Sequence, residues 1–215
     1  MVTQILYGEL FEVIQTKENW VEIKITHDNY CCYIDKKQFR EASISSYKKL
    51  NFDYQTIGKP ITQFESNGKS FLLFAGSIID GDNSSKKLTI NEYALQFLHA
   101  PYLWGGRTIA GIDCSGYSQL IYRLIGIAIP RDAYQQAEIG ETVSFVTETL
   151  EGDLAFFDNK EGRITHVGII LKDNDDTYII HASGKVRIDK LDHHGIYNSD
   201  TKTYSHKLRV IKRII

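Results

Sequence analysis

A cysteine and two histidines in the second half of the chain have the residue types of a nucleophilic catalyst. Cys114 follows the glycine-rich stretch YLWGGRTIAGID and opens a segment in which apolar residues recur every three or four positions. This periodicity predicts a helix that begins at Cys114 and ends before Gly126. The free backbone N–H groups of a first helical turn stabilise an anion, so we expect the pKa of the Cys114 thiol to fall and its thiolate to be the nucleophile.

The same helical turn offers a site for negative charge on a substrate. The amides of Cys114 and Ser115 would face the carbonyl oxygen of a bound amide and stabilise a tetrahedral intermediate. Cys114 alone does not establish catalysis, because a free cysteine is commonly just a small buried residue. The catalytic interpretation therefore depends on partners elsewhere in the chain.

His166 and His181 are the candidate partners, and they stand at the ends of two predicted strands. His166 begins HVGIIL and His181 ends TYIIHA, with the turn-forming NDD between them. If the two strands pair antiparallel, both imidazoles lie at one edge of the sheet. We then assign His166 as the base that takes the thiol proton and His181 as the group that orients it.

The sequence assigns no catalytic role to the remaining histidines in this half of the chain and predicts no metal site. His193, His194 and His206 match no partner pattern, and we expect them at the surface. Zinc is the other common use of one cysteine and two histidines, but the chain lacks a short ligand pair such as CxxC or HxxxH. We expect no metal and no other cofactor.

The elements that must position these residues follow an α+β order. Thr89 and Glu92 form a capping-box pattern, which predicts a helix that ends at Pro101. After the Cys114 helix come a short helical piece and then strand patterns, at 132–140, 153–157, 165–171, 177–182, 185–188 and 206–215. Helices first and strands afterwards predict helices packed on an antiparallel sheet.

The first 80 residues predict a small β-barrel. Strand patterns occur at 4–14, 20–25, 30–34 and 70–79, with a long polar connection at 41–60. The stretch GDNSSKK at 81–87 is polar and turn-prone, so we place a linker there, between a domain at 1–80 and a second domain at 88–215.

Composition excludes several classes of function. The 215 residues are 42% hydrophobic and 24% charged with a net charge of −2, which is globular usage without the basic surface that nucleic acid requires. Cys31, Cys32 and Cys114 do not form a disulfide framework, which fits a reducing compartment. We find no signal-peptide pattern and no apolar run of about 20 residues. We expect no membrane span, a monomer, and a cytoplasmic location, or a periplasmic or secreted one if a signal peptide was removed.

Six segments in the second half resemble a known family. YLWGG, DCSG, IPRDAYQQ, GDLAFF, THVGII and IIHASGKVRID, in this order and at these separations, look like the NlpC family of bacterial cell-wall cysteine peptidases, which have a papain-like fold. The resemblance covers about residues 88–215. It implies that Cys114, His166 and His181 are the nucleophile, the base and the orienting residue, and that Tyr102 points into the site and helps to hold the oxyanion.

The first half resembles the bacterial SH3-like barrels that precede this peptidase in enzymes acting on peptidoglycan fragments. HDNYCCYI is similar to a strand of those barrels, although Cys31, Cys32 and Tyr33 replace the more usual Glu, Gly and Trp. Such enzymes cleave between γ-D-glutamate and a diamino acid. The departures leave the contacts made by the barrel as the weaker part of the match.

The resemblance also implies residues for substrate specificity. Asp132 matches the carboxylate that pairs with the free α-amine of a peptide substrate, a charge-assisted contact. Asp113 and Ser115 match contacts to the substrate backbone, and Tyr30 and Glu9 of the barrel are expected to close the pocket over an N-terminal L-Ala. Arg131 is expected to support Asp132.

Together these features lead us to expect a cysteine endopeptidase of cell-wall recycling. Its substrates would be muropeptides such as L-Ala-γ-D-Glu-diaminopimelate, or the lysine equivalent, cut after γ-D-Glu. Two alternatives stay open: an amidase or acyltransferase with the same triad, since the triad does not determine the leaving group, and a binding module whose barrel tethers an inactive second domain to cell wall.

Overall fold

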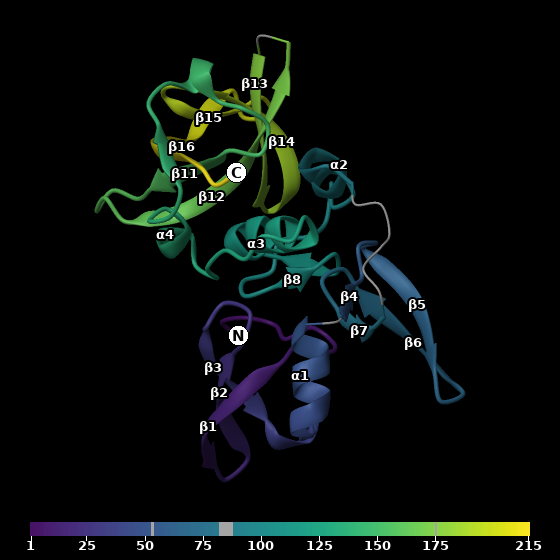
Figure 1. Cartoon of the computed structure of the whole chain (residues 1–215). Helices are drawn as coiled ribbons and strands as arrows, with labels where there is room; N and C mark the ends of the chain where they lie inside the picture. Colours follow the sequence, from purple (N-terminus) through teal and green to yellow (C-terminus); the bar gives the residue numbers. More distant parts are fainter. Residues whose placement is uncertain (53, 82–87, 175) are drawn as a thin grey trace.

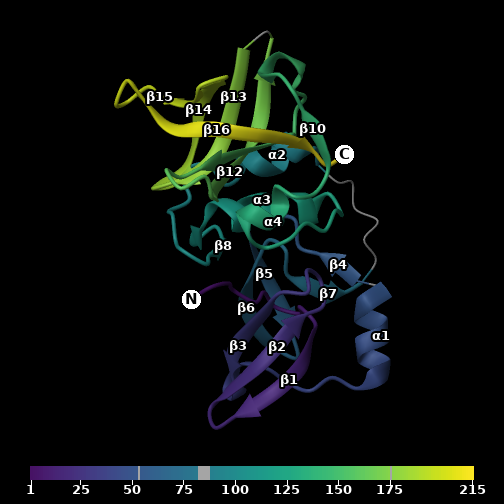
Figure 2. The same cartoon turned by 90° about the vertical axis from the view of Figure 1, so that its left-hand side faces the viewer.

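The computed structural model describes residues 1–52, 54–81, 88–174 and 176–215. Figure 1 shows two lobes, which we name the N-terminal lobe (residues 1–81) and the C-terminal lobe (residues 88–215). Except for Gly81, the predicted linker at 81–87 lies outside the described residues. Helix α3 (Cys114–Leu124) lies between the large sheet of the C-terminal lobe and the N-terminal lobe (Figures 1 and 2).

The C-terminal lobe is built on one antiparallel sheet of seven strands, ordered β10-β16-β11-β12-β13-β14-β15. Because β15 also pairs with β16, the strands from β11 to β16 close into a ring. The strands are β10 (Glu141–Val143), β11 (Leu154–Asp158), β12 (Ile164–Asp173), β13 (Asp176–Ser183), β14 (Lys185–Asp192), β15 (Gly195–Asn198) and β16 (Thr203–Arg213). The five predicted strands of this half are therefore confirmed, and β10 and β15 are additional.

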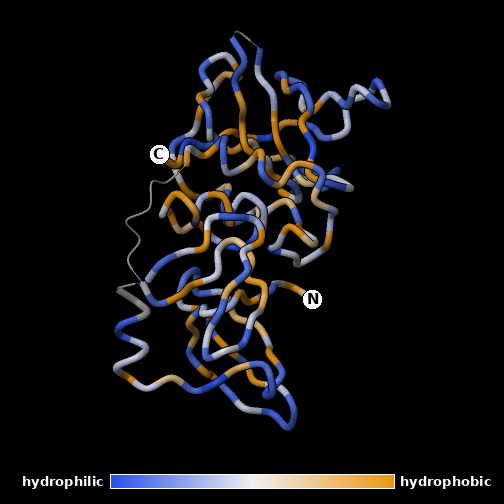
Figure 3. Tube along the Cα trace, turned by 90° about the vertical axis from the view of Figure 1, so that its right-hand side faces the viewer, coloured by the Kyte–Doolittle hydropathy of each residue, from blue (hydrophilic) through white to orange (hydrophobic). Residues whose placement is uncertain are grey.

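The apolar residues of these strands supply two cores. One set, which includes Phe156 and Val167, packs against α3, and the other, which includes Phe157 and Ile170, comes from strands all around the ring and fills it. Alternate residues of a strand point to opposite faces, so neighbours in sequence enter different cores. Figure 3 shows apolar residues gathering along the strands of this lobe and polar residues in the projecting loops.

The helices of the C-terminal lobe pack on the sheet, as the order of the patterns predicts. Helix α2 (Ile90–Leu95) has the predicted capping box, in which the Glu92 N–H donates to Thr89 Oγ1 (3.2 Å) and the Thr89 N–H donates to Glu92 Oε2 (2.7 Å). It ends earlier than expected. The short helix α4 (Ala133–Gln136), the 3-10 turn η2 (Val146–Glu148) and the small ladder of β8 (Arg107–Thr108) and β9 (Gly111–Ile112) complete the lobe. No helix in the described ranges is long and apolar enough to cross a membrane.

The N-terminal lobe contains three separate antiparallel ladders instead of one continuous barrel sheet among the described residues. The strands are β1 (Phe11–Lys17), β2 (Trp20–Ile25), β3 (Cys31–Asp35), β4 (Tyr54–Thr56), β5 (Ile61–Ser66), β6 (Lys69–Phe74) and β7 (Ile78–Asp80), paired β1-β2-β3, β4-β7 and β5-β6. Val21, Ile23 and Ile25 are buried as their alternation predicts. The 3-10 turn η1 (Lys36–Gln38) follows β3.

The predicted long connection at 41–60 is wrong, because it contains helix α1 (Ile44–Phe52) and strand β4. Of the residues of α1 whose side chains the structure describes, 44–49, none is buried, and Ile44 is 77% exposed, so this part of the segment carries no apolar stripe. Periodicity reveals a helix only when one side of it is buried.

The two lobes share a tightly packed interface. Leu6 and Ala75 of the N-terminal lobe are buried in the same apolar core as Leu120 of α3. Gly76 has a φ of +85°, and a Cβ there would lie 2.7 Å from the side chains of both Leu120 and Leu6. Only glycine suits this close approach.

A buried ion cluster also joins the lobes. Glu9 accepts hydrogen bonds from Arg107 at 2.9 and 3.0 Å, from Arg123, and from the Leu6 N–H at 2.7 Å. Burial opposes ionisation, but the charges of the two arginines outweigh it and lower the pKa of Glu9 to about 2. A folded-state pKa below the unfolded value means that this stabilisation is complete above about pH 4.5 and is lost as the pH falls towards 2.

Glu9→Gln should therefore destabilise the chain at pH 7 by about 3–5 kcal/mol, because it leaves two buried guanidinium groups without a counter-ion. Urea unfolding followed by circular dichroism measures the effect. The matched control is Asp80→Asn, which breaks the exposed 2.6 Å pair with Lys49 and should cost less than about 1 kcal/mol. Equal losses for both variants would contradict the assignment.

Candidate active site

Cys114 is the first residue of α3, as predicted, and its neighbours explain why the helix starts there. Asp113 is the N-cap, and its Oδ1 accepts from the Gly116 N–H at 2.6 Å. A Cβ on Gly116 would lie 2.4 Å from the carbonyl oxygen of Gly106. The sequence DCSG thus combines a cap, a nucleophile and a glycine that lets the helix rest on the preceding loop.

Asp113 is also the centre of a buried network. Its oxygens accept from the Gly105 N–H at 2.7 Å and from both terminal nitrogens of Arg131 at 2.7 and 3.1 Å. Ser115 Oγ donates to Asp113 at 3.4 Å and accepts from Arg131 at 2.9 Å. Asp113 and Ser115, which we expected to contact substrate, are thus buried and bonded to the protein. Arg131, expected to support Asp132, forms its ion pair with Asp113.

The Cys114 thiol is buried against the backbone that flanks His166. Its Sγ lies 3.9 Å from the Thr165 carbonyl oxygen, and the Val167 N–H lies close enough to favour the thiolate. Burial and the Asp113 charge raise the pKa of Cys114 to about 11, against the opposing effects of the Val167 and Ser115 amides and Arg131. The expectation of a lowered pKa is wrong for the free protein, because loss of hydration outweighs the first-turn amides.

His166 and His181 are brought together as the antiparallel pairing predicts. Strands β12 and β13 are antiparallel, and His166 Nε2 lies 2.7 Å from His181 Nδ1. Gly168 leaves room on β12 beside His181, since a Cβ there would lie 2.6 Å from the Ile179 side chain and 2.8 Å from His181 Cβ. Burial and the neighbouring His181 and His206 hold the pKa of His166 well below 6.5, so it is a neutral base at pH 7.

Asp189 extends this chain and was not identified from the sequence. Its Oδ2 lies 2.9 Å from His181 Nε2, and Arg187 pairs with both carboxylate oxygens at 2.6 and 2.7 Å. Arg187 and Asp189 lie in KVRID, a segment of β14, and β14 pairs with the strand of His181. An expected pairing of these two strands is the sequence signal that could have identified Asp189.

This chain of contacts determines the tautomers of both histidines. A carboxylate only accepts, so His181 Nε2 must carry hydrogen and His181 Nδ1 must be a lone pair. His166 Nε2 must then donate to it, which leaves His166 Nδ1 free of hydrogen. A base needs such an unprotonated nitrogen in order to take a thiol proton.

His206 is not a surface residue without a partner, so that expectation is wrong. Its ring stacks on His166 with centroids 4.2 Å apart and an interplanar angle of 22°. Burial and the nearby His181 lower the pKa of His206 to about 4, so the stacked ring is neutral at pH 7. The sequence gave no signal for this contact because β16 returns to the site only through the closed sheet.

Tyr102 lies close to Cys114, and Asp132 lies beside Arg131 and Tyr30. Burial and the charges of Cys114 and Asp113 raise the pKa of Tyr102 to about 12, so its hydroxyl remains a proton donor. Asp132 is half-buried, and its pKa is raised by burial and by Asp113, against the effect of Arg131. The Tyr30 hydroxyl of the N-terminal lobe lies beside the Asp132 side chain and opposes this rise.

Glu9, by contrast, is separated from this group. Its carboxylate is 1% exposed and both of its oxygens accept from protein donors in the ion cluster between the lobes. We therefore correct its expected role from substrate contact to joining the lobes.

Alkylation of Cys114 in the free protein tests its protonation state. With a pKa of about 11, its rate of reaction with iodoacetamide should rise about tenfold per pH unit from pH 7 to 10. Peptide mass spectrometry measures each cysteine separately, and the exposed Cys31 checks that the reagent remains active. A plateau below pH 8 would show a thiolate and contradict the burial argument.

The tautomers are tested by ¹⁵N chemical shifts of the imidazole nitrogens. We expect hydrogen on Nε2 and a lone pair on Nδ1 in both His166 and His181. Asp189→Asn, whose amide can donate, should change the populations of both rings. Asp200→Asn, which removes an exposed partner of Arg187, should leave them unchanged. Wild-type tautomers in Asp189→Asn would show that Asp189 does not set them.

Known proteins share both parts of this chain. Residues 99–205 match the NlpC/P60 family, and residues 1–39 match the bacterial dipeptidyl-peptidase Sh3 domain. A Bacillus subtilis protein named gamma-D-glutamyl-L-lysine dipeptidyl-peptidase is 47% identical over 75 residues, which are 34% of this chain and 25% of the relative. A Bacillus cereus protein of the same name is 39% identical over 95 residues, 43% of this chain and 28% of the relative.

The fold has a counterpart among solved structures. The crystal structure of an NlpC/P60 family protein from Bacillus cereus superposes with a TM-score of 0.79 at 21% identity, over 99% of this chain and 81% of that one. By contrast, the chain aligns with only about a quarter of the length of the two curated relatives. The match of 99–205, which contains the cysteine and both histidines, together with that of 1–39, shows that the chain carries an NlpC/P60-family domain behind a bacterial dipeptidyl-peptidase SH3 domain.

Proposed function

We propose that this chain is a cysteine peptidase that hydrolyses the bond after γ-D-Glu in peptidoglycan stem peptides with a free N-terminal L-Ala. The observation that carries the proposal is the Cys114–His166 arrangement: a thiol at the head of α3, buried over the backbone around a neutral imidazole whose tautomer is fixed. The names of the two Bacillus relatives support the substrate class.

The reaction begins with a neutral Cys114 thiol and a neutral His166 imidazole. As Cys114 Sγ attacks the carbonyl carbon of γ-D-Glu, its proton passes to His166 Nδ1, and the cation is stabilised through His181 by the Asp189 charge. The Tyr102 hydroxyl and the first-turn amides of α3 stabilise the oxyanion.

His166 then gives the proton to the leaving amine of the diamino acid. The C–N bond breaks and a thioester to Cys114 remains. Water, deprotonated by His166, attacks the thioester carbon. The C–S bond breaks, L-Ala-D-Glu is released, and His166 returns the proton to the Cys114 sulfur. Every proton that leaves the thiol or the water is thus returned through one imidazole.

Recognition of a free N-terminus is assigned to Asp132 and Tyr30. A partly exposed carboxylate next to a phenol offers an ammonium group one charged and one neutral acceptor. The two groups come from different lobes, so substrate would bind across their junction. We accordingly propose domains at 1–80 and 88–215, a papain-like arrangement for the second, and a monomer as the active unit.

The test is mass spectrometry of L-Ala-γ-D-Glu-L-Lys and of its diaminopimelate equivalent, each with a free and an acetylated amine. The wild type should release L-Ala-D-Glu from the free-amine peptides, and acetylation should slow release about tenfold or more, the value of a charged hydrogen bond. Asp132→Asn should lose most of this preference.

Cys114→Ala should release no product, and Cys31→Ser is the matched control that should retain wild-type rates. No cleavage of any peptide by the wild type would overturn the proposal. Cleavage of a different bond would favour an amidase of the same fold.

A further inference from the structure

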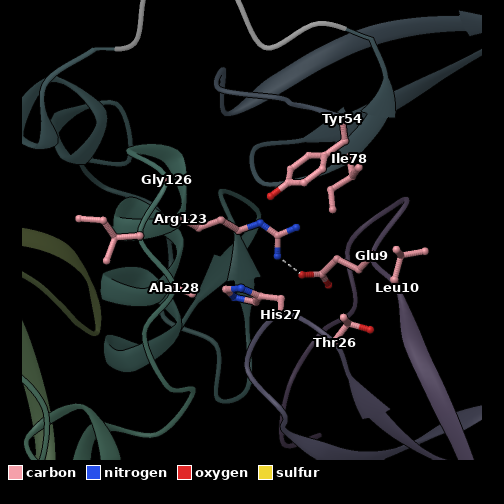
Figure 4. Close-up of a pocket in the computed structure, with 10 residues that line it drawn as sticks. Glu9, Leu10, Thr26, His27, Tyr54, Ile78, Arg123, Gly126 and Ala128 are labelled. Carbon is pink, nitrogen blue, oxygen red and sulfur yellow. Dashed lines mark hydrogen bonds and ion pairs between the residues drawn. The ribbon is translucent and has the colours of Figure 1, made fainter. Parts of the chain in front are cut away.

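A cavity of about 200 Å³ lies between the lobes at the far end of α3 from Cys114 (Figure 4). The C-terminal lobe contributes Arg123 and the loop at Gly126, and the N-terminal lobe contributes Glu9, His27 and Tyr54. The remaining lining residues are Leu10, Thr26, Ile78, Ile127 and Ala128. Arg123 is nine positions after Cys114, which on a helix corresponds to about 13 Å. The cavity is therefore separate from the catalytic group.

Arg123 brings an incompletely used guanidinium to this cavity. In the described part of the chain its only hydrogen bond runs from Nη1 to Glu9 Oε1, so the Nε–H and Nη2–H donors have no protein acceptor there. Figure 4 shows the guanidinium pointing between the Tyr54 hydroxyl and Glu9. A guanidinium with free donors matches the geometry of a carboxylate or a phosphate.

The charges around the cavity also favour an anion. Two arginines, Arg107 and Arg123, share the single carboxylate of Glu9, which leaves one positive charge in the cluster. Asp28 adds a negative charge nearby, but its oxygens accept from the neutral Tyr30 N–H at 3.0 Å and Gln119 amide at 2.8 Å and not from either arginine. A buried positive charge without a paired anion is unfavourable.

His27 supplies a third polar group. Its Nε2 is buried and has no hydrogen-bond partner among the described residues. Burial and the two arginines lower the pKa of His27 to about 4, so the ring is neutral at pH 7 and can donate one hydrogen bond. Buried polar atoms in folded proteins are nearly always satisfied, so His27 Nε2 calls for a partner that the described protein atoms do not supply.

We propose that this cavity binds a small oxyanion, a carboxylate or phosphate group, held by the free donors of Arg123, the His27 Nε2–H and the Tyr54 hydroxyl. The bound anion would complete the ion cluster and link the lobes. It would act at the junction on which substrate recognition by Tyr30 and Asp132 depends.

Thermal unfolding at pH 7 tests the proposal, with sodium phosphate or sodium acetate added at constant ionic strength set with sodium chloride. Ligand binding to the folded state raises Tm with a saturating dependence on concentration. We expect such a rise with at least one of the two anions. A rise in Tm with phosphate alone would identify a phosphoryl ligand, and a rise with acetate alone would identify a carboxylate ligand. A rise with both anions would show that the site binds either group.

Variants locate the binding. His27→Phe fills the ring position without a donor and should raise the apparent Kd of the anion at least tenfold. His193→Phe, at an exposed histidine, should leave this Kd unchanged. Cys114→Ala should respond like the wild type, which separates this cavity from the catalytic site. If His27→Phe does not fold, Tyr54→Phe replaces it and should raise the apparent Kd of the anion at least threefold.

Two results would overturn the proposal. One is the absence of any rise in Tm beyond that of sodium chloride. The other is an unchanged Kd in His27→Phe, or in Tyr54→Phe where that variant replaces it. Neither result bears on peptide cleavage, so the outcome is independent of the proposed enzymatic function.

Discussion

The buried carboxylate of Asp113 is the constraint on which the site depends. It caps α3, holds the glycine-rich loop through the Gly105 N–H, and is neutralised by Arg131. Each contact fixes a different segment relative to Cys114: the helix, the loop before it, and the segment that leads to Asp132. A carboxylate buried to this degree is stable only with such partners, so the position of Cys114 depends on the contacts of Asp113.

Burial also determines the resting state of the catalytic groups. It raises the pKa of Cys114 and lowers that of His166, so both effects favour the neutral thiol and imidazole over the ion pair. Such a site carries no reactive thiolate before substrate arrives. The His181–Asp189 chain holds a negative charge two hydrogen bonds from His166, where it would stabilise an imidazolium during the proposed attack.

The junction of the lobes connects recognition with stability. Tyr30 reaches Asp132 from the N-terminal lobe, while Glu9 of the same lobe is fully enclosed by two arginines. From the sequence we expect the same role for Tyr30 and Glu9, but only Tyr30 reaches Asp132. Both are polar residues flanking strands, and nothing in their local sequence indicates that one meets a carboxylate and the other two cations.

The sequence alone determined those helices and strands whose caps and buried faces depend on residues close to one another along the chain. The Thr89 cap, the apolar periodicity after Cys114 and the alternation around Val21 each arise within a few residues, because caps and buried faces depend on near neighbours. Tertiary structure decided what depends on distant segments. His206 stacks on His166 only because β15 and β16 close the sheet, and the pKa of Cys114 rises because strands remote in sequence exclude water from it. Hydration and ring stacking are properties of the assembled fold, so no window of the sequence contains them.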